Sequence, residues 1–543
     1  MTSVIASASL WETLRDHLDH DGRRAYAGVP ADEPELLDAA ASRNDEVIVT
    51  RDQRLAAFAA CGWAMITGRA AVLAVQAGPS FENARTGILE TMSLRTPLIV
   101  VATANRTDAR GRRGFQELDV TRSSPELFVW QYHVSDAAHL EWAVRTAVRV
   151  SEGTRSGPVL LSIDPDLHPV PADAGAIPPP RPLSSVHPSD AAIAEVSAVC
   201  SAAAHPVIIL GAGAKRAGRR DALVNLADAL DARVLVTGSG RGAFPESSAR
   251  FAGLAGLYAT DAGREALRRA DVILALGTQL EETAREGIPG TATIVQVDID
   301  ATILERSVLP VLGVVGDCAE TVDALNGVLA PPRARSGLRR AASVARADGA
   351  SIPTAPLFWT LLSQTVASVD ARGLWTICQE NGLGDLWGYD ADTFVLPEGW
   401  GIIGPGEQTA MGFGLGASIG AAAAGARVVA VCGDGALEQN LSWVLTATER
   451  NAEIVLFVLR NRRFGWPSLS RPSSDVTTLL PSTRDLVSFA ESSGARVWRA
   501  RSVDELSSAL AEATLAQGTR LVEVDVSDLE MIPGVKAVMG PSK

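Results

Sequence analysis

The stretch VVAVCGDGALEQNLSWVLTATERNAEIVLFVLRNRRFG, residues 428–465, decides how the last third of the chain folds. A short apolar run ends in Gly433-Asp434-Gly435, and a second one ends at Asn461. Helix-like sequence separates the two runs. Short apolar runs joined by a helix are typical of parallel strands that are buried on both faces of a sheet. The stretch therefore predicts two neighbouring strands whose carboxyl ends bring Asp434 and Asn461 to one sheet edge.

Polar residues at this edge suit a metal-bound phosphate. Glycines at a strand end let the backbone approach an anion, and the helix that follows offers free N–H groups. An aspartate would repel phosphate unless a divalent cation lay between them. We expect Asp434 and Asn461 to bind Mg²⁺ together with diphosphate oxygens, water and a backbone carbonyl, for which Arg463 is the best candidate. A GDG turn alone would predict no such site; the second strand and Asn461 make the difference.

The alternation of short apolar runs with helical stretches extends over the whole chain of 543 residues, which is too long for one core. The proline-rich segments 174–190 and 330–353 are the expected linkers. The sequence thus predicts an α/β protein of three consecutive domains, each with a mostly parallel sheet flanked by helices. The expected ranges are 1–175, 190–329 and 353–535.

The GDG segment with its Asn-containing turn resembles the thiamine diphosphate (ThDP) enzymes of the pyruvate decarboxylase, acetolactate synthase and benzoylformate decarboxylase superfamily. The segments GPGEQTAMGFGLGASIGAA (404–422), AGPSFENARTGILETMSLRTPLIVV (77–101) and GFQELD (114–119) also resemble that family. The resemblance implies a pyrimidine-binding first domain, a Rossmann-like central domain and a diphosphate-binding third domain. It implies cofactor contacts from Thr409, Met411, Gly433, Gly435, Ala436 and Asn461, and metal contacts from Asp434, Asn461 and Arg463.

The central domain offers a weaker signal. Gly211, Gly213 and Gly218 suggest a dinucleotide site, but the complete GxGxxG is absent because position 216 is Arg. Some family members hold FAD or ADP there, whereas we favour an empty scaffold.

Position 53 departs from the family pattern. The family places a glutamate nine residues before the glycine of an "aDGyAr" sequence, where it hydrogen-bonds the pyrimidine N1′ and assists proton removal from the cofactor. Gly62 is that glycine here, and position 53 is Gln. Three interpretations remain open: Gln53 supports a weakened proton relay, a shifted register restores Asp52 as the acid, or the protein binds the cofactor without catalysis. We favour the first.

Three further residues are candidates for the substrate side. Asp32 lies where pyruvate decarboxylases keep a catalytic aspartate, although it also suits a helix N-cap. Gln76 stands where benzoylformate decarboxylases place a histidine, and Gln116 belongs to the Gln-bearing loop. The resemblance implies a lyase or transferase that decarboxylates a 2-oxo acid to an enamine, which then gives an aldehyde or is ligated to an acceptor. Decarboxylase and acetolactate-synthase-like carboligase are both open.

Composition limits the partners. A formal net charge of −14 argues against a nucleic-acid surface, and no apolar run is long enough for a membrane span. Five dispersed cysteines without a CxxC pattern indicate reduced thiols in a cytoplasmic protein. Because family active sites lie between two chains, the resemblance implies at least a homodimer, with a homotetramer common.

Overall fold

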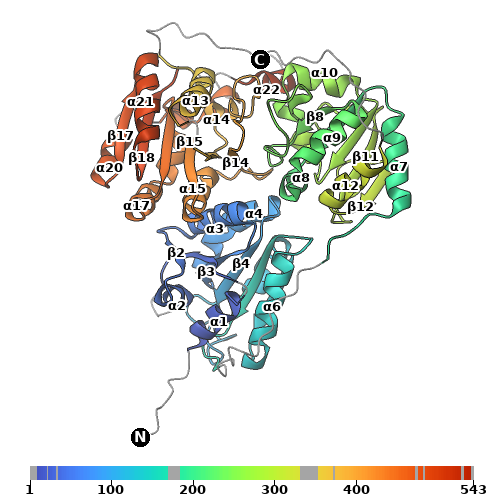
Figure 1. The fold of residues 1–543 in the computed structure, drawn as a ribbon. Coiled ribbons are helices and arrows are strands. Elements are labelled where there is room, and N and C mark those ends of the chain that lie inside the picture. The colour runs from blue at the N-terminus through green and yellow to red at the C-terminus, as the bar shows by residue number, and fades with distance from the viewer. Residues whose placement is uncertain are drawn as a thin grey trace. The chain divides into compact units, whose positions relative to one another are not determined.

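Three six-stranded parallel sheets flanked by helices confirm the predicted α/β fold class (Figure 1). The structure is a computed structural model that describes residues 9–20, 22–31, 35–168, 184–329, 352–370, 373–470, 475–480, 484–527 and 531–539. By their contacts, the residues form two compact units. Unit 1 comprises Met1–Leu183, Gln408–Val428 and Asn440–Ile454, and unit 2 comprises Ser184–Glu407, Val429–Gln439 and Val455–Lys543. The domain ranges 1–175, 190–329 and 353–535 stay predictions.

The first sheet belongs to unit 1 and has the strand order β2-β1-β3-β4-β6-β5. Its strands are β1 (Ala25–Gly28), β2 (Glu46–Val49), β3 (Ala71–Gln76), β4 (Leu98–Thr103), β5 (Trp130–Val134) and β6 (Pro158–Ile163). The helices of this part are α1 (Leu10–Leu18), α2 (Leu36–Ser42), α3 (Gln53–Thr67), α4 (Pro79–Ser93), α5 (Val120–Ser123) and α6 (Leu140–Ser151).

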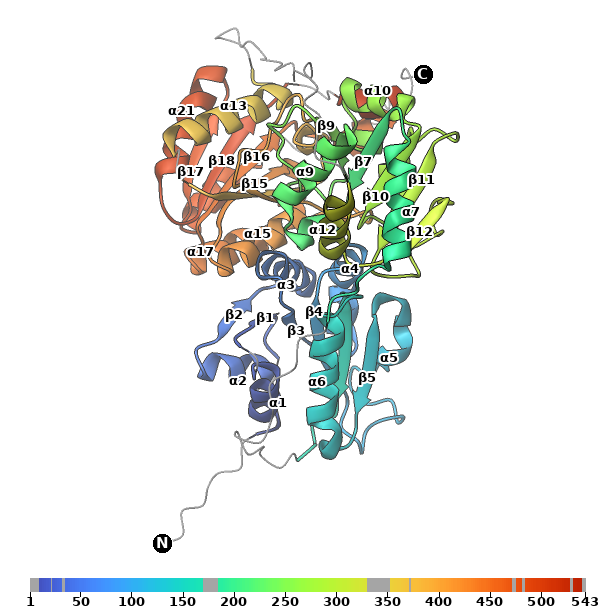
Figure 2. The same ribbon diagram turned by 45° about the vertical axis from the view of Figure 1, so that its right-hand side comes forward.

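Unit 1 also contains α15 (Phe413–Ala423) and α17 (Ser442–Glu449), which come from the last third of the sequence. Helix α15 lies beside α3, as both ribbon views show (Figure 2). A Cβ atom on Gly62 of α3 would stand within 2.5 Å of the Ala417 Cα, so the glycine permits this close approach. The rings of Phe58 and Phe413 meet edge to face at 5.7 Å between centroids. The two helices therefore form one tightly packed core layer.

The second sheet lies in unit 2 and has the order β12-β11-β10-β7-β8-β9, which is the strand order of Rossmann folds. Its strands are β7 (Pro206–Leu210), β8 (Arg233–Val236), β9 (Phe251–Leu254), β10 (Val272–Leu276), β11 (Thr293–Asp298) and β12 (Leu312–Val315). Its helices are α7 (Asp190–Ser201), α8 (Ala212–Ala217), α9 (Arg220–Leu230), α10 (Asp261–Arg269), α11 (Glu282–Arg285) and α12 (Cys318–Val328).

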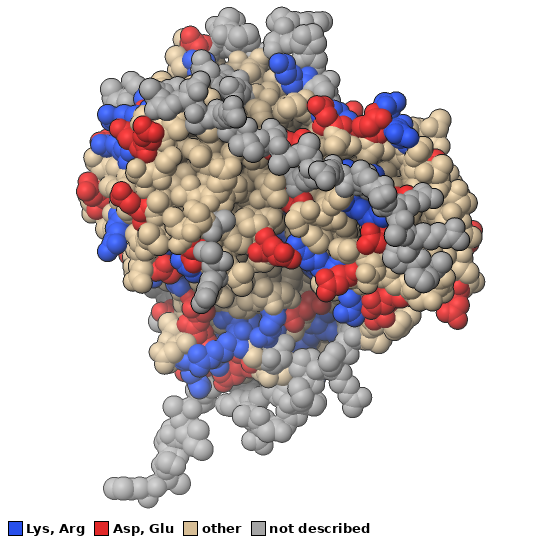
Figure 3. Space-filling model, turned by 45° about the horizontal axis from the view of Figure 1, so that its top comes forward, with Lys and Arg blue, Asp and Glu red and all other residues tan. Residues whose placement is uncertain are grey.

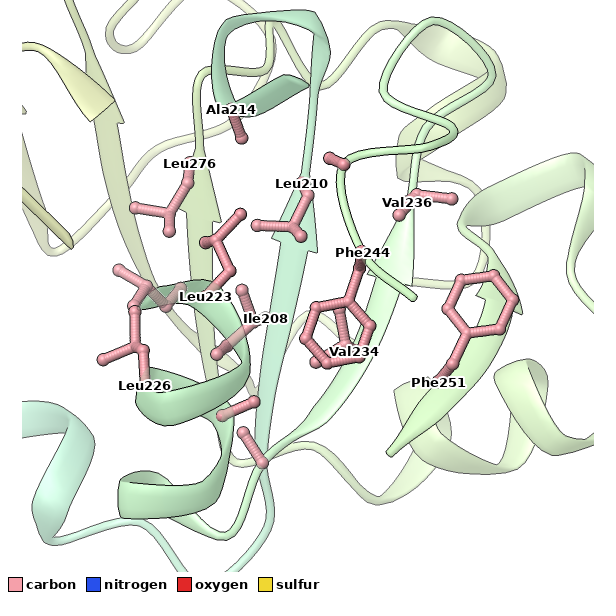
Figure 4. Close-up of a cluster of buried hydrophobic side chains, with 14 of the residues drawn as sticks. Ile208, Leu210, Ala214, Leu223, Leu226, Val234, Val236, Phe244, Phe251 and Leu276 are labelled. Carbon is pink, nitrogen blue, oxygen red and sulfur yellow. The ribbon is translucent and has the colours of Figure 1, made fainter. Parts of the chain in front are cut away.

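Aliphatic and aromatic side chains fill the space between this second sheet and α9 (Figure 4). Ile208 and Leu210 of β7 face Leu223 and Leu226 of α9. The glycines at the end of β7 serve packing, because a Cβ on Gly213 would stand 2.8 Å from the Gly277 Cα. The glycine pattern of the central segment thus has a structural cause that requires no nucleotide.

The third sheet, also in unit 2, repeats the connectivity of the first with the order β14-β13-β15-β16-β18-β17. Its strands are β13 (Trp375–Gln379), β14 (Gly401–Ile403), β15 (Arg427–Gly433), β16 (Ile454–Arg460), β17 (Arg496–Ala500) and β18 (Arg520–Asp525). The remaining helices are α13 (Ala355–Val369), α14 (Leu383–Leu386), α16 (Asp434–Gln439), α18 (Gly465–Ser470), α19 (Asp475–Thr478), α20 (Leu486–Ser492), α21 (Val503–Leu515) and α22 (Pro533–Met539).

Surface and cysteine chemistry agree with the composition. Acidic and basic side chains are intermixed over the face that Figure 3 shows. All five cysteines are buried and free, as predicted. Among the described helices, none combines the length and the apolar composition that a bilayer-spanning segment requires.

Candidate active site

A cavity of about 340 Å³ opens at the carboxyl edge of the first sheet. It brings together three of the predicted site residues, Gln53, Gln76 and Gln116. Its other lining residues are Val29, Pro30, Pro79, Ser80 and Asn83. These described lining residues include four amide side chains and no ionisable one. The cavity is therefore a neutral site that offers amide donors and acceptors.

The strand ends explain why these residues meet. Gln76 ends β3, Val29 follows β1, and Gln53 begins α3 after β2. These three strands are neighbours in the sheet. Ligands of open parallel sheets bind beyond the carboxyl ends of the strands. The cavity therefore lies where the topology of the sheet favours a binding site.

The register at the start of α3 is fixed by a helix cap. Asp52 is the N-cap residue, and its carboxylate accepts hydrogen bonds from the backbone N–H groups of Arg54 at 2.7 Å and Leu55 at 3.2 Å. Gln53, one position later, lines the cavity. The Asp52 carboxylate is thus engaged in capping the helix, whereas the Gln53 side chain faces the cavity; the choice between the two as the residue that meets the cofactor stays a prediction.

The loop that carries Gln116 is held by its own backbone contacts. The carboxylate of Glu117 accepts hydrogen bonds from the N–H groups of Gly111 and Gly114, and the Gly114 bond is 2.9 Å long. These backbone donors lower the pKa of Glu117. Gln116 has a left-handed φ of 55°. The Gln116 carbonyl oxygen lies close to Gly78, and a Cβ at position 78 would stand only 2.5 Å from that oxygen. The loop thus holds Gln116 at the cavity in an uncommon backbone conformation.

The segment before α15 is anchored within unit 1 by Glu90. This fully buried carboxylate accepts the backbone N–H of Ala410 at 2.8 Å, between the predicted cofactor residues Thr409 and Met411. Thr409 has a φ of 46°. A second link runs from Arg54 to Asn440, with 3.0 Å between Nη2 and Oδ1. Sequence reasoning missed Glu90, because a buried glutamate on an amphipathic helix has no local signature.

The predicted metal residues lie in unit 2. Asp434 follows β15 and Asn461 follows β16, and these strands are neighbours, as predicted. The N–H of Arg462 donates to Asp434 Oδ2 at 2.8 Å, and the N–H of Arg463 donates to Asn461 Oδ1 at 3.1 Å. Asp434 is only 4% exposed, and burial raises its pKa to about 6. Asp434 and Asn461, which were expected to bind Mg²⁺, are therefore both hydrogen-bonded to the backbone of the turn that follows β16.

Other acidic groups surround this edge. Glu380 follows β13, the other neighbour of β15, and is fully buried. Burial, and then the charge of Glu380, raise the pKa of Asp385 well above its usual range. The Asp385 carboxyl therefore stays neutral to higher pH, whereas an ionised Asp434 would repel an uncompensated diphosphate. A divalent cation would offset this negative charge.

The residues at this edge fit a hard cation. Asp434 and Asn461 supply oxygen atoms. Arg463 forms a β-bridge with Leu479, and beside it the Arg462 carbonyl accepts a hydrogen bond from the Leu480 N–H at 2.8 Å. The Arg463 carbonyl stays the predicted backbone ligand. Mg²⁺ takes oxygen ligands of this kind and keeps several waters. Within the described ranges, no group of three or more His, Cys, Asp or Glu side chains is placed to hold a metal ion.

The glycines of the GDG turn differ in their surroundings. A Cβ on Gly433 would meet no atom within 4 Å, whereas one on Gly435 would stand 2.9 Å from the Phe464 ring. Gly433 therefore faces open space and Gly435 a packed ring. Helix α16, which contains Ala436, covers only Asp434–Gln439. Asp32, the remaining predicted site residue, lies outside the described residues.

Comparison with known families identifies the class of protein. Residues 9–123 match the N-terminal TPP binding domain of thiamine pyrophosphate enzymes, residues 193–325 match their central domain, and residues 389–524 match their C-terminal TPP binding domain. The chain therefore belongs to the thiamine diphosphate-dependent enzymes.

Similar proteins include both acetolactate synthases and decarboxylases. The large subunit of acetolactate synthase isozyme 3 from Escherichia coli is 27% identical, over 89% of this chain and 88% of that protein. A probable 2-ketoarginine decarboxylase from Pseudomonas aeruginosa is also 27% identical, over 88% and 86%. The structure of a 4-hydroxybenzoylformate decarboxylase from Rhodococcus jostii has a TM-score of 0.83 and 21% identity, covering 96% of this chain and all of that one. The last likeness supports the fold.

Proposed function

We propose that this protein is a cytoplasmic, ThDP- and Mg²⁺-dependent enzyme that cleaves or forms the carbon–carbon bond next to the keto group of a 2-oxo acid. The observation that carries the proposal is the cavity that brings Gln53, Gln76 and Gln116 together at the carboxyl edge of the first sheet. Similarity to acetolactate synthases and to a 2-ketoarginine decarboxylase supports the substrate class.

The two ends of the cofactor have different partners in this proposal. Asp434, Asn461 and the Arg463 carbonyl would hold Mg²⁺, and the diphosphate would lie beside Gly433, Gly435 and Ala436. The Thr409 carbonyl and Met411 contact the central rings, and Gln53 meets the pyrimidine. By resemblance, the pyrimidine and diphosphate sites of one cofactor come from two chains. We therefore propose a homodimer as the minimum active form, and a homotetramer as the assembled one.

The cavity residues bind and orient the substrate. When bound, ThDP would supply a nucleophilic carbon for addition to the keto group and a cationic ring that takes up the electron pair left when CO₂ departs. The side-chain N–H groups of Gln76 and Gln116 donate to the carboxylate and keto oxygens of the 2-oxo acid. Gln53 binds the pyrimidine but transfers no proton. Asp32 is the proposed proton donor when the product is an aldehyde, and ligation to a second carbonyl compound is the other outcome.

A second candidate is a ThDP-binding protein without catalysis. The neutral cavity favours it, because the described lining residues include no group that takes up or releases a proton near pH 7. Both candidates bind the cofactor, so binding alone does not separate them.

Proton exchange at the reactive carbon separates the two candidates. ThDP bound with Mg²⁺ is transferred to D₂O, and loss of the C2 proton is followed by rapid acid quenching and NMR. The catalytic proposal expects faster exchange than in free ThDP, and a further increase in Gln53→Glu. Exchange no faster than in the free cofactor would refute catalysis. CO₂ release from a panel of 2-oxo acids, with Asp434→Asn as the inactive control, then identifies the substrate.

A further inference from the structure

The amide of Gln53 has a partner that restricts how it meets a ligand. Asn83 Nδ2 of α4 donates to Gln53 Oε1 of α3 over 2.6 Å. Both side chains line the cavity. The two helices are closely packed, and a Cβ on Gly87 of α4 would overlap the Cβ of Ala57 of α3. The helix pair therefore holds the two amides in register.

This hydrogen bond selects which end of the Gln53 amide remains for a ligand. An amide has one acceptor oxygen and one NH₂ donor on its two branches. Because Asn83 donates to the oxygen branch, the other branch, with its two Nε2 hydrogens, is turned away from Asn83 and is the one that Gln53 offers to a ligand. A carboxylate at this position would accept from Asn83 with one oxygen and keep the other oxygen for the ligand. Asn83 therefore has opposite consequences for a glutamine and for a glutamate.

The carboxylates nearest to this amide pair on α3 and α4 have charged partners of their own. Asp52 caps α3 and lies 3.7 Å from Arg54, measured from Oδ2 to Nη2. On α4, Glu82 lies 3.5 Å from Arg85. Each carboxylate beside the amide pair thus has a guanidinium nearby. The carboxylates of Asp52 and Glu82 are thus engaged, and the Gln53 amide is the group that lines the cavity here.

We propose that Asn83 is a positioning residue that makes Gln53 a hydrogen-bond donor, so that the cavity binds the ThDP pyrimidine with N1′ unprotonated. The inference rests on the proposed function, which places the pyrimidine against Gln53. A neutral N1′ accepts from Nε2, whereas a protonated N1′ would set two donors against each other. The neutral 4′-amino form of the ring is retained as a result.

The test measures the protonation of N1′ directly. The holoprotein is prepared with Mg²⁺ and ThDP labelled with ¹⁵N at N1′, and the nitrogen chemical shift is followed against pH. In the natural protein the pKa of bound N1′ should lie below that of free ThDP. Asn83→Asp replaces the donor with a pure acceptor of the same shape. The Gln53 amide should then turn over, present its oxygen and raise the pKa of N1′ by at least one unit, which is tenfold in the protonation equilibrium.

Thr86→Asp is the matched control, because it adds the same charge one turn along the exposed face of α4 without touching Gln53. Its effect should be less than a third of that of Asn83→Asp. If the pKa of bound N1′ in the natural protein is higher than that of free ThDP, the inference is overturned, whereas the proposed function is not. Equal shifts in the two aspartate variants also overturn it. Absence of a bound ¹⁵N resonance at saturating cofactor overturns the proposed function and the inference with it.

Discussion

Gly62→Ala tests the close packing of α3 on α15. The new Cβ would lie within 2.5 Å of the Ala417 Cα and nearer still to the Ala417 oxygen. Normal carbon contacts need about 3.5 Å, so the helices must separate by about 1 Å. Both obstructing atoms belong to the backbone, and no side-chain rotation relieves the overlap.

The expected cost follows from this geometry. Overpacking costs about 1–3 kcal/mol, and the upper value applies because the obstruction is backbone. Alanine is favoured over glycine in a helix by about 1 kcal/mol, which leaves a net loss of about 2 kcal/mol. A loss of that size raises the population of locally opened α15 roughly 30-fold. Thr409 and Met411 precede this helix, so the change also reaches the predicted cofactor segment.

Hydrogen exchange followed by mass spectrometry is the suitable assay, because a chain with several domains need not unfold in one step. Peptides from Phe413–Ala423 should exchange roughly 30-fold faster in Gly62→Ala. Gly327→Ala is the matched control, since a Cβ at Gly327 of α12 would meet no atom within 4 Å. That variant should be neutral or slightly stabilised. Unchanged exchange in α15 would refute the packing argument, as would an equal effect of the control.

Three further substitutions test the sites and the buried charges. Asp434→Asn should weaken ThDP binding in Mg²⁺ at least roughly 100-fold by calorimetry, whereas Glu438→Gln, which removes the same charge one turn away, should change it less than threefold. Glu90→Leu leaves the Ala410 N–H without its buried acceptor and should lower the free energy of unfolding by about 2 kcal/mol, while Glu90→Gln should cost less than half of that. Burial raises the pKa of Asp19 to about 6, so its carboxylate is disfavoured in the folded state. Relative to Asp19→Asn, the natural protein should therefore lose up to about 3 kcal/mol of stability as the pH rises from about 4 to 6. Denaturant unfolding of both proteins at each pH measures this difference. A gain in stability over that range would contradict the assigned direction of the pKa shift.

The sequence predicted the central strands better than the edges. The runs at β3, β4, β10 and β16 are continuous, apolar and buried, and the expected strands are present. Strands such as β14, with three residues, and β5, whose side chains are mostly half-buried, lie at sheet edges. An edge strand pairs on one side only, so its sequence needs less apolar content. Edge strands are therefore hard to find from hydrophobic runs.

Some residues of the candidate site could be predicted from the sequence, and others could not. Asp434 and Asn461 follow strand ends, where topology alone brings them together, and the structure confirms that placement. Asn83 bonds to the first residue of α3 and Glu90 to the segment before α15, in both cases through contacts between residues far apart in the sequence. Their sequence context is that of an ordinary amphipathic helix. Such roles depend on tertiary packing, so local patterns do not reveal them.

Three of the loops that we propose to bind ligands contain a residue with an uncommon backbone conformation. Asp231 has a positive φ at the C-cap of α9, where aspartate adopts it readily. Gln116, Thr409 and Arg462 have φ values of 55°, 46° and 60°, although their side chains do not favour this region. Each such residue costs about 1 kcal/mol or more, which glycine would avoid. These three positions lie on the Gln-bearing loop, the segment before α15 and the Asn461 turn, which are the loops assigned to substrate, ring and metal. The same conformation occurs at Arg95, Leu280 and Glu305, outside these loops, so ordinary turns and the loops proposed to bind ligands share this backbone cost.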